Sequence, residues 1–367
     1  MDFKTLLEVG DLNGKRVLVR VDWNVPIKDG SVADDFRIRE SLPTIEYLIK
    51  NGAKVTIISH LESSISTGSQ QEISLEPVYE CAKKLLPDLL FKEDGDLVLL
   101  ENLRQNAGEK ENSREFALSL TKNMDLFVNE AFPASHREHA SIVGVPKLLP
   151  SFAGLRFTEE VKRLSKAFYP KHPFLFILGG AKFDTKLPLI DKFIQIADFL
   201  FVGGALAHNF FKEMKHNIGD SLVSNQEFGL LDKIATGKII LPSEVVVKGH
   251  DGIRAEAVEH VAEGDVILDA GPRTLEDLEE RIHSSQFILW NGPLGNYENG
   301  FKEGTLKLAQ LLAESGKEVI IGGVDTLACI EELDLFDKYS FVSTGGGAML
   351  DFLATGTLPG IEALKKI

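Results

Sequence analysis

Short runs of Val, Ile, Leu and Phe alternate along the chain with longer stretches in which apolar residues recur every three or four positions. The short runs are typical of buried strands and the longer stretches of amphipathic helices, so the pattern predicts repeated β-α units and parallel sheets. In the first half we expect strands near 16–21, 54–58, 97–100 and 125–128. In the second half we expect strands near 174–178, 199–202, 239–247, 265–269, 286–289, 318–321 and 340–343.

The two groups of strands are separated by residues 151–168, where Leu155, Val161 and Leu164 indicate an amphipathic helix that ends at the turn YPKHP. A chain of 367 residues exceeds what one core usually serves. We therefore predict an α/β protein with two doubly wound, Rossmann-like parallel-sheet domains, joined by an interdomain helix with a hinge at its ends. The predicted parts are an N-terminal domain (1–152), the connecting helix (153–170) and a C-terminal domain (171–349).

The strands of the two halves lead into different residues. Strands of the first half lead into Arg, His, Asn and Asp, and most strands of the second half lead into glycine. Ligands of parallel sheets bind at the carboxyl ends of the strands. Guanidinium and imidazole groups suit a small anionic substrate, whereas glycine turns that open onto helices suit the phosphates of a nucleotide. The contrast predicts a phosphoryl-transfer enzyme. The candidate residues of the first half are Asp22, Asn24, Arg37, His60, Arg104 and Arg137.

The second half offers three candidate phosphate or metal motifs. In ILGGAKFDTK, Lys182 and Lys186 would place two ammonium groups on one helical face, although solvated surface lysines would give the same spacing. The glycines of STGGGA predict an anion-binding turn before a helix. Asp325, after the glycines of VIIGGVDT, could bind Mg²⁺ or cap the next helix. Glu298 could accept from ribose hydroxyls or be a solvated loop acid. Neither a P-loop motif nor a dinucleotide GxGxxG motif occurs.

Charge and composition exclude several classes of protein. The net charge of −15 argues against nucleic acid or an anionic membrane as a partner. No apolar run approaches the ~20 residues of a membrane helix, and the first residues lack a signal-peptide pattern. Cys81 and Cys329 lack metal-ligand spacing and indicate a reducing cytosol. The polar segment 62–72 predicts a mobile loop.

Several long segments closely resemble the phosphoglycerate kinase family and stand in that family's order. They are VLVRVDWNVP, DDFRIRESLPTI, LLENLR, NEAF with SHREHAS, ILGGAKFDTK, WNGPLG, IIGGVDT and STGGGA, between about residues 16 and 360. The resemblance therefore covers nearly the whole chain. It implies a cytoplasmic, monomeric, glycolytic and gluconeogenic kinase that transfers a phosphoryl group reversibly between 1,3-bisphosphoglycerate with ADP and 3-phosphoglycerate with ATP.

The resemblance also implies roles for individual residues. The N-terminal domain would bind the acid through the six candidates named above, and the C-terminal domain would bind MgADP or MgATP. Arg37, Lys182 and Gly346 would serve the transferring group, and Asp325 would hold Mg²⁺. The implied nucleotide-binding residues are Lys182, Lys186, Gly203, Gly204, Asn291, Pro293, Glu298, Gly323, Val324, Asp325, Thr326, Thr344, Gly345, Gly346 and Gly347. The C-terminal tail (350–367) would pack on the N-terminal domain.

The chain departs from the family pattern after His60. There the family's Gly-Arg-Pro is replaced by Glu62, Ser63 and Ser64, so an arginine that contacts the acid is missing. We expect a raised KM for 3-phosphoglycerate unless another cation, such as Lys28 or Lys147, fills the gap. The remaining departures are Pro133 and Ala134 for Gly-Thr, Val324 for a glycine and Arg273 for a lysine. Two alternatives remain: a catalytically weakened relative that acts as a ligand-binding or interaction protein, and an unrelated doubly wound nucleotide-dependent ligase.

Overall fold

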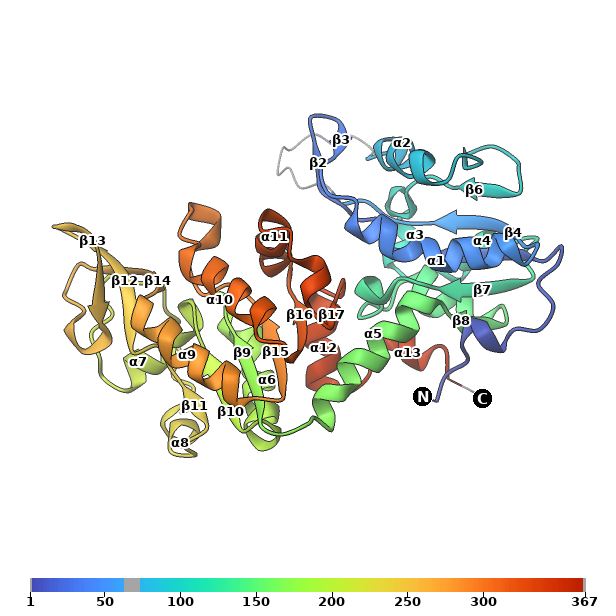
Figure 1. Ribbon diagram of the computed structural model, residues 1–367. Coiled ribbons are helices and arrows are strands. Elements are labelled where there is room, and N and C mark those ends of the chain that lie inside the picture. Colours follow the sequence, from blue (N-terminus) through green and yellow to red (C-terminus); the bar gives the residue numbers. More distant parts are fainter. Residues whose placement is uncertain (1, 63–72, 366–367) are drawn as a thin grey trace. The chain divides into compact units, whose positions relative to one another are not determined.

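The computed structural model describes residues 2–62 and 73–365 (Figure 1). The chain separates into two compact units: a first unit of residues 1–162 and 355–367, and a second unit of residues 163–354. The segment expected to be a mobile loop, apart from Glu62, lies outside the described residues. Among the helices of the described chain, none is both long and apolar enough to cross a membrane.

The first unit is built on a six-stranded parallel sheet with the strand order β5-β6-β4-β1-β7-β8. Its strands are β1 (Arg16–Arg20), β4 (Lys54–Ile58), β5 (Leu90–Phe91), β6 (Leu97–Leu99), β7 (Leu126–Asn129) and β8 (Ser151–Ala153). Its longer helices are α1 (Phe36–Lys50), α2 (Glu76–Leu85) and α4 (Arg114–Thr121), with shorter α3 (Ala107–Lys110) and a hairpin of β2 (Ile27–Lys28) and β3 (Ser31–Val32). All four strands expected in this half are present.

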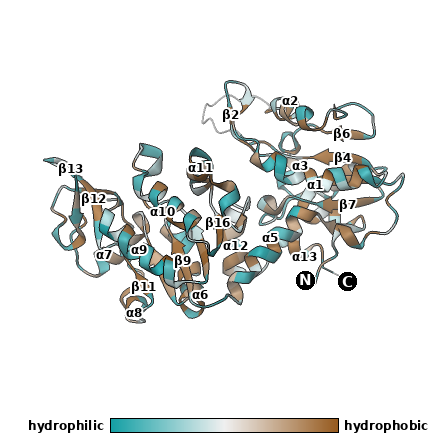
Figure 2. Cartoon of the chain, viewed as in Figure 1, coloured by the Kyte–Doolittle hydropathy of each residue, from teal (hydrophilic) through white to brown (hydrophobic). Residues whose placement is uncertain are grey.

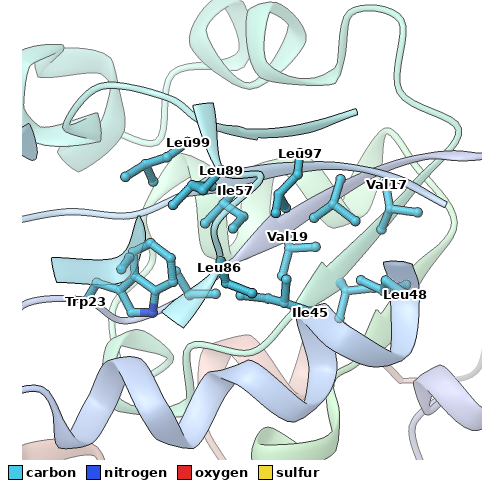
Figure 3. Close-up of a cluster of buried hydrophobic side chains, with 14 of the residues drawn as sticks. Val17, Val19, Trp23, Ile45, Leu48, Ile57, Leu86, Leu89, Leu97 and Leu99 are labelled. Carbon is cyan, nitrogen blue, oxygen red and sulfur yellow. The ribbon is translucent and has the colours of Figure 1, made fainter. Parts of the chain in front are cut away.

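Helices cover both faces of this sheet because successive side chains of each strand point to opposite faces. Val17 and Val19 of β1 pack in one core with Ile45 and Leu48 of α1, as Figure 3 shows. Leu18, between the two valines, packs in a second core that includes residues of β7 and α4. A strand that is buried on both faces must be apolar throughout, which explains the continuous apolar runs.

The second unit contains another six-stranded parallel sheet, with the order β11-β10-β9-β15-β16-β17. Its strands are β9 (Phe174–Leu178), β10 (Phe199–Val202), β11 (Ile239–Ile240), β15 (Phe287–Asn291), β16 (Glu318–Gly322) and β17 (Phe341–Val342). Its helices are α6 (Phe183–Ile196), α7 (Ala205–Glu213), α8 (Leu231–Ile234), α9 (Pro272–Ser284), α10 (Glu303–Glu314), α11 (Val324–Glu332) and α12 (Gly347–Thr355). Hydrophobic colouring is concentrated on strands such as β9 and β16, whereas the helices carry both colours (Figure 2).

A three-stranded antiparallel sheet, β13-β12-β14, accompanies the parallel sheet of the second unit. It consists of β12 (Glu244–Gly249), β13 (Gly252–Ala257) and β14 (Val266–Ala270). The single strand expected at 239–247 is therefore wrong, because that segment forms β11 in one sheet and β12 in the other. Pro242 lies between the two strands and has no backbone N–H with which to continue a ladder.

The helix expected at 151–168 is shorter than predicted. Residues 151–153 form β8, which pairs with β7 and extends the first sheet, and α5 (Leu155–Ser165) starts only after Gly154. A 3-10 turn (Lys166–Phe168) follows α5. The three apolar residues that suggested the helix, Leu155, Val161 and Leu164, all lie in α5. Only the expected start was wrong, because a neighbouring strand supplies residues 151–153 with backbone partners that sequence periodicity does not reveal.

The C-terminal segment returns to the first unit. The N–H of Gly360 donates to the carbonyl of Ser135 at 2.9 Å, and Ala363 packs against a core cluster that includes Ala131 and Ile142. The short helix α13 (Pro359–Glu362) lies in this segment. Residues 355–367 group with the first unit, whereas residues 350–354, in α12, group with the second.

Candidate functional site

The six candidate residues of the first unit lie after the carboxyl ends of β1, β4, β6 and β7 or at the start of α1. These four strands are neighbours in the sheet, so their ends share one edge. Arg37 Nη1 donates to Asp22 Oδ2 at 3.0 Å and to the carbonyl of Asn24 at 3.1 Å. His60 Nδ1 lies 3.6 Å from Asp22 Oδ1. The fold therefore brings these four residues together.

Glu62 links the remaining two arginines to this group. Its carboxylate Oε1 accepts from Arg104 Nη1 and, at 3.1 Å, from Arg137 Nη1. Its backbone N–H donates to Asn24 Oδ1 at 2.9 Å. A glutamate thus occupies part of the basic cluster at the position where the family pattern has glycine, while Ser63 and Ser64 lie outside the described residues.

Arg104 retains an unused hydrogen-bonding edge. Its side chain is 6% exposed, and no described residue accepts from its buried Nε or Nη2. His139 Nδ1 is likewise buried without a hydrogen-bond partner in the described part of the chain. Burial, followed by the charge of Arg104, lowers the pKa of His139 to about 4. Unpaired buried donors are costly, so this edge is suited to an anion with oxygen acceptors.

A buried hydrogen-bond network, which the sequence analysis did not predict, holds His60 in place. Arg20, fully buried in β1, donates to Ser141 Oγ at 2.9 Å, and Ser141 Oγ donates to Glu109 Oε1 at 2.6 Å. Arg20 Nη2 lies 2.9 Å from His60 Nδ1. Because a guanidinium only donates, Nδ1 must accept, which leaves the ring proton on Nε2. The signal for this network was available, because Arg20 is the one charged residue within the apolar run VLVRV of residues 17–21.

The electrostatic environment keeps His60 neutral. Burial, followed by the charges of Arg20 and Arg104, holds the pKa of His60 well below its ordinary value. A neutral imidazole with its proton on Nε2 can donate one hydrogen bond to an anion without adding a charge.

The candidate nucleotide site of the second unit is a cavity of about 370 Å³ at the carboxyl ends of the parallel strands. Four of the predicted residues line it: Gly204, Pro293, Glu298 and Asp325. Its other walls are largely apolar and include Ala207, His208, Phe211, Leu222, Pro242, Val245, Leu268 and Leu294. An apolar slot with a few convergent polar groups is a typical small-molecule site.

Close backbone packing explains the glycine at position 204. Gly204 has φ +59°, and a Cβ there would lie 2.8 Å from the backbone N of Gly180 and 3.0 Å from the carbonyl O of Pro293. Any side chain would therefore clash with the backbone that forms the wall of the cavity. Gly203, its neighbour, donates its N–H to the carbonyl of Leu178 at 2.9 Å and so joins β10 to β9.

The two lysines do not share a helical face, so that expectation is wrong. Lys182 precedes α6 and is exposed, whereas Lys186 is 7% exposed and its ammonium group donates to the carbonyl of Gly179. Burial lowers the pKa of Lys186 to about 8, and the charge of Asp325 opposes this shift. The glycine turn after β9 brings a carbonyl within reach of Lys186, a contact that helical spacing alone does not indicate.

Several other predicted residues hold the strand ends in place. Asn291 Nδ2 donates to the carbonyl of Gly322 at 2.9 Å, and Thr326 Oγ1 accepts from the N–H of Gly292 at 3.0 Å. Gly323 (φ +115°) stands before α11, whose first residue, Val324, is 66% exposed. Asp325 lies in the first turn of α11 and not at its N-cap, so the helix-capping alternative is wrong.

The last predicted motif, residues 344–347, follows β17. Thr344 is buried, and the N–H of Gly345 donates to Ser343 Oγ at 3.1 Å. Gly346 has φ +51°, and Gly347 is the first residue of α12. The turn therefore leads into a helix N-terminus, as expected for an anion-binding turn.

Asp269 is a residue of the cavity that sequence reasoning missed. Asp269 lies near the end of β14, directly after the apolar residues of that strand. Its carboxylate accepts from the N–H groups of Ala270 and Gly304 at 2.8 and 2.9 Å. Burial raises its pKa to about 6, and these two N–H groups oppose the shift. Asp269 thus ties the first turn of α10 to the end of β14. An acid at the end of a predicted strand was the available signal.

Comparison with known proteins gives a consistent result. The sequence model of the family described as phosphoglycerate kinase matches residues 7–356. The chain is 39% identical to a phosphoglycerate kinase of Dictyoglomus turgidum over 99% of both chains, and 40% identical to one of Wolbachia over 98% of both. Among solved structures, a phosphoglycerate kinase of Coxiella burnetii superposes with a TM-score of 0.84 at 35% identity, covering 99% of this chain and 98% of that one.

Proposed function

The chain belongs to the phosphoglycerate kinase family, and on that premise we propose how its residues carry out the family's reaction. The reaction is the reversible transfer of a phosphoryl group between 1,3-bisphosphoglycerate with ADP and 3-phosphoglycerate with ATP, as in glycolysis and gluconeogenesis. The enzyme is a phosphotransferase with a carboxyl group as acceptor. The family uses ATP or ADP together with a divalent metal ion.

The acid binds in the first unit, and one observation carries this assignment. Arg37, Arg104 and Arg137 converge at one edge of the sheet, and Arg104 keeps a buried edge without an acceptor among the described residues. The phosphate and carboxylate of 3-phosphoglycerate supply the oxygens that such guanidinium groups bind in pairs. His60 and Asn24 add neutral hydrogen bonds, and Asp22 orients Arg37.

The nucleotide binds in the second unit. Its base occupies the apolar cavity beside Gly203 and Gly204, and Glu298 accepts from the ribose hydroxyls. Lys182, Lys186 and the turn 344–347 face the phosphates. The remaining contacts come from Asn291, Pro293, Gly323, Val324 and Thr326. Magnesium is the metal, and Asp325 is the residue that would hold it.

The donor set fits a metal that arrives with the nucleotide. Within the described chain there is no cluster of three or more His, Cys, Asp or Glu residues of the kind that binds a metal by itself. Mg²⁺ in nucleotide enzymes is typically held by one or two carboxylates plus phosphates and water. When bound, it would neutralise phosphate charge.

Transfer requires the two substrates to meet, although their sites lie in different units. We infer that α5 and the turns at its ends act as the hinge. Phosphoryl transfer needs positioned cations and the exclusion of water more than covalent chemistry. Arg37 and Lys182 stabilise the moving phosphoryl group from the acid side and the nucleotide side, and Gly346 presents a backbone N–H to it.

The enzyme acts as a cytoplasmic monomer in this proposal. Both cysteines are free, Cys81 half-buried and Cys329 buried, in keeping with a reducing compartment. Neither the relatives nor the structure supports the alternative of a weakened relative that only binds ligands.

A coupled assay tests the proposal directly. The purified chain, given 3-phosphoglycerate and MgATP, is expected to form ADP at a rate that EDTA abolishes and added Mg²⁺ restores. Absence of turnover, together with calorimetric binding of 3-phosphoglycerate, would instead establish the ligand-binding alternative. A chain that shows neither turnover nor binding would overturn both the kinase proposal and the ligand-binding alternative.

A further inference from the structure

Glu62 carries a carboxylate, the same chemical group as the carboxylate of 3-phosphoglycerate. Its carboxylate is held by Arg104 and Arg137, and its backbone N–H is held by Asn24, so it engages three of the six residues assigned to the acid. The substrate's carboxylate, or two oxygens of its phosphate, would make the same kind of contact with these guanidinium groups.

The contacts of Glu62 with Arg104, Arg137 and Asn24 all lie within the first unit. Arg104 is 6% exposed at its side chain, whereas Glu62 and Arg137 are 40% and 39% exposed. Partial burial would favour the neutral acid, but the charges of Arg104 and Arg137 outweigh it and keep the pKa of Glu62 below its ordinary value. Glu62 is therefore an anion throughout the neutral pH range, and it cancels positive charge at the site.

We propose that Glu62 is an affinity-determining residue that competes with 3-phosphoglycerate for Arg104 and Arg137. This inference rests on the proposed function of the acid site. Glu62 lies outside helices and strands, and its partly exposed side chain can move into solvent when the substrate arrives. Nε and Nη2 of Arg104 have no acceptor among the described residues and provide the first point of contact for the incoming anion.

The extent to which Glu62 weakens the binding of 3-phosphoglycerate depends on the fraction of time that its carboxylate occupies the arginines. A tethered ligand acts at an effective concentration on the order of millimolar, and the apparent dissociation constant is the intrinsic one divided by the fraction of open sites. A site that is open about one-tenth of the time binds its substrate about tenfold more weakly. The weakening applies to the acid alone, since the nucleotide binds in the other unit.

The test is Glu62→Gln, which removes the charge but keeps the shape and the backbone N–H to Asn24. We expect KM for 3-phosphoglycerate to fall about tenfold, with kcat and the KM for MgATP nearly unchanged. Titration calorimetry with 3-phosphoglycerate alone should show a matching gain in affinity, a readout that does not depend on turnover. Thermal melting checks that the variant is folded.

Asp96→Asn is the matched control, because Asp96 is an exposed carboxylate of the same unit that pairs with Lys54. Asp96→Asn removes one negative charge, as Glu62→Gln does, but at a position outside the site. We therefore expect no change in the KM for 3-phosphoglycerate or in the KM for MgATP. An unchanged affinity in Glu62→Gln would overturn the inference, because Glu62 would then not compete with the substrate. A weaker affinity would also overturn it and would show that Glu62 orients the arginines instead. Absence of turnover in the wild type would count against the proposed function, whereas the calorimetric comparison would still decide the role of Glu62.

Discussion

Lys182 and Lys186 differ more in environment than their spacing suggests. Lys182 is exposed ahead of α6, whereas the buried Lys186 already donates to a backbone carbonyl. A charge that is free to meet the transferring phosphoryl group stabilises mainly the transition state. Lys182→Ala should therefore lower kcat by roughly 10²- to 10³-fold and leave the melting temperature nearly unchanged.

The control for this substitution is Lys248→Ala, which removes another exposed lysine of the same unit. Steady-state kinetics of both variants with 3-phosphoglycerate and MgATP provide the comparison. A kcat of Lys182→Ala within a few-fold of the wild-type value would show that this lysine does not serve the transferring group.

At the scale of elements, the start of α5 depends on a buried carboxylate. Glu130, at the end of β7, accepts from the N–H groups of Arg156 and Phe157 at 2.9 and 3.1 Å and from the Thr44 hydroxyl at 2.5 Å. It therefore satisfies the free N–H groups of the helix and ties them to the sheet. Near pH 5, where the folded chain keeps the proton of Glu130, Glu130→Gln should lower the free energy of unfolding by about 1–2 kcal/mol, measured by urea denaturation.

Glu159→Gln on the same helix is the appropriate control. Glu159 is 34% exposed at its side chain and lies 3.9 Å from Lys162, so its substitution should change the unfolding free energy by less than about 1 kcal/mol. Equal effects of the two substitutions would mean that Glu130 does not anchor the helix.

Glu130 also predicts a dependence of stability on pH. Burial raises its pKa from 4.5 to about 7, against the opposing hydrogen bonds from Thr44 and the helix. Between these values the unfolded chain has lost the proton and the folded chain has kept it, so the stability that Glu130 contributes falls as pH rises through this window. The difference in unfolding free energy between wild type and Glu130→Gln should therefore be larger near pH 4.5 than near pH 8. A difference that is constant with pH would contradict the raised pKa.

At the scale of the whole molecule, the two proposed substrate sites belong to separate compact units that α5 joins through the chain. We expect the units to close only when both ligands are bound, because each substrate alone contacts one unit. Small-angle scattering with 3-phosphoglycerate and MgADP, a pair that does not react, should show a smaller radius of gyration than the free enzyme or either binary complex. An unchanged radius with both ligands would argue against hinge closure.

Much of this protein follows from its sequence because the determining forces are local. Continuous apolar runs specify strands that are buried on both faces, and the residue that follows each run must lie at the carboxyl edge of the sheet. The sequence predicts for this reason that Asp22 and His60, which follow two neighbouring strands, lie close together, and they do. Arg37 joins them from the start of α1. The motifs that identify the family are likewise contiguous segments, so one sequence was enough to suggest it.

The tertiary structure alone decided which distant groups pair. Whether residues 151–153 extend a sheet or begin a helix depends on β7, and the division of 239–247 depends on two different sheets. Arg20 donates a hydrogen bond to Ser141, which is 121 residues away in the sequence. Glu62 accepts from Arg104 and Arg137, which are 42 and 75 residues away. Periodicity reports how a residue relates to its own element, whereas the charge and hydrogen bonds around a buried side chain are set by whichever elements the fold packs against it.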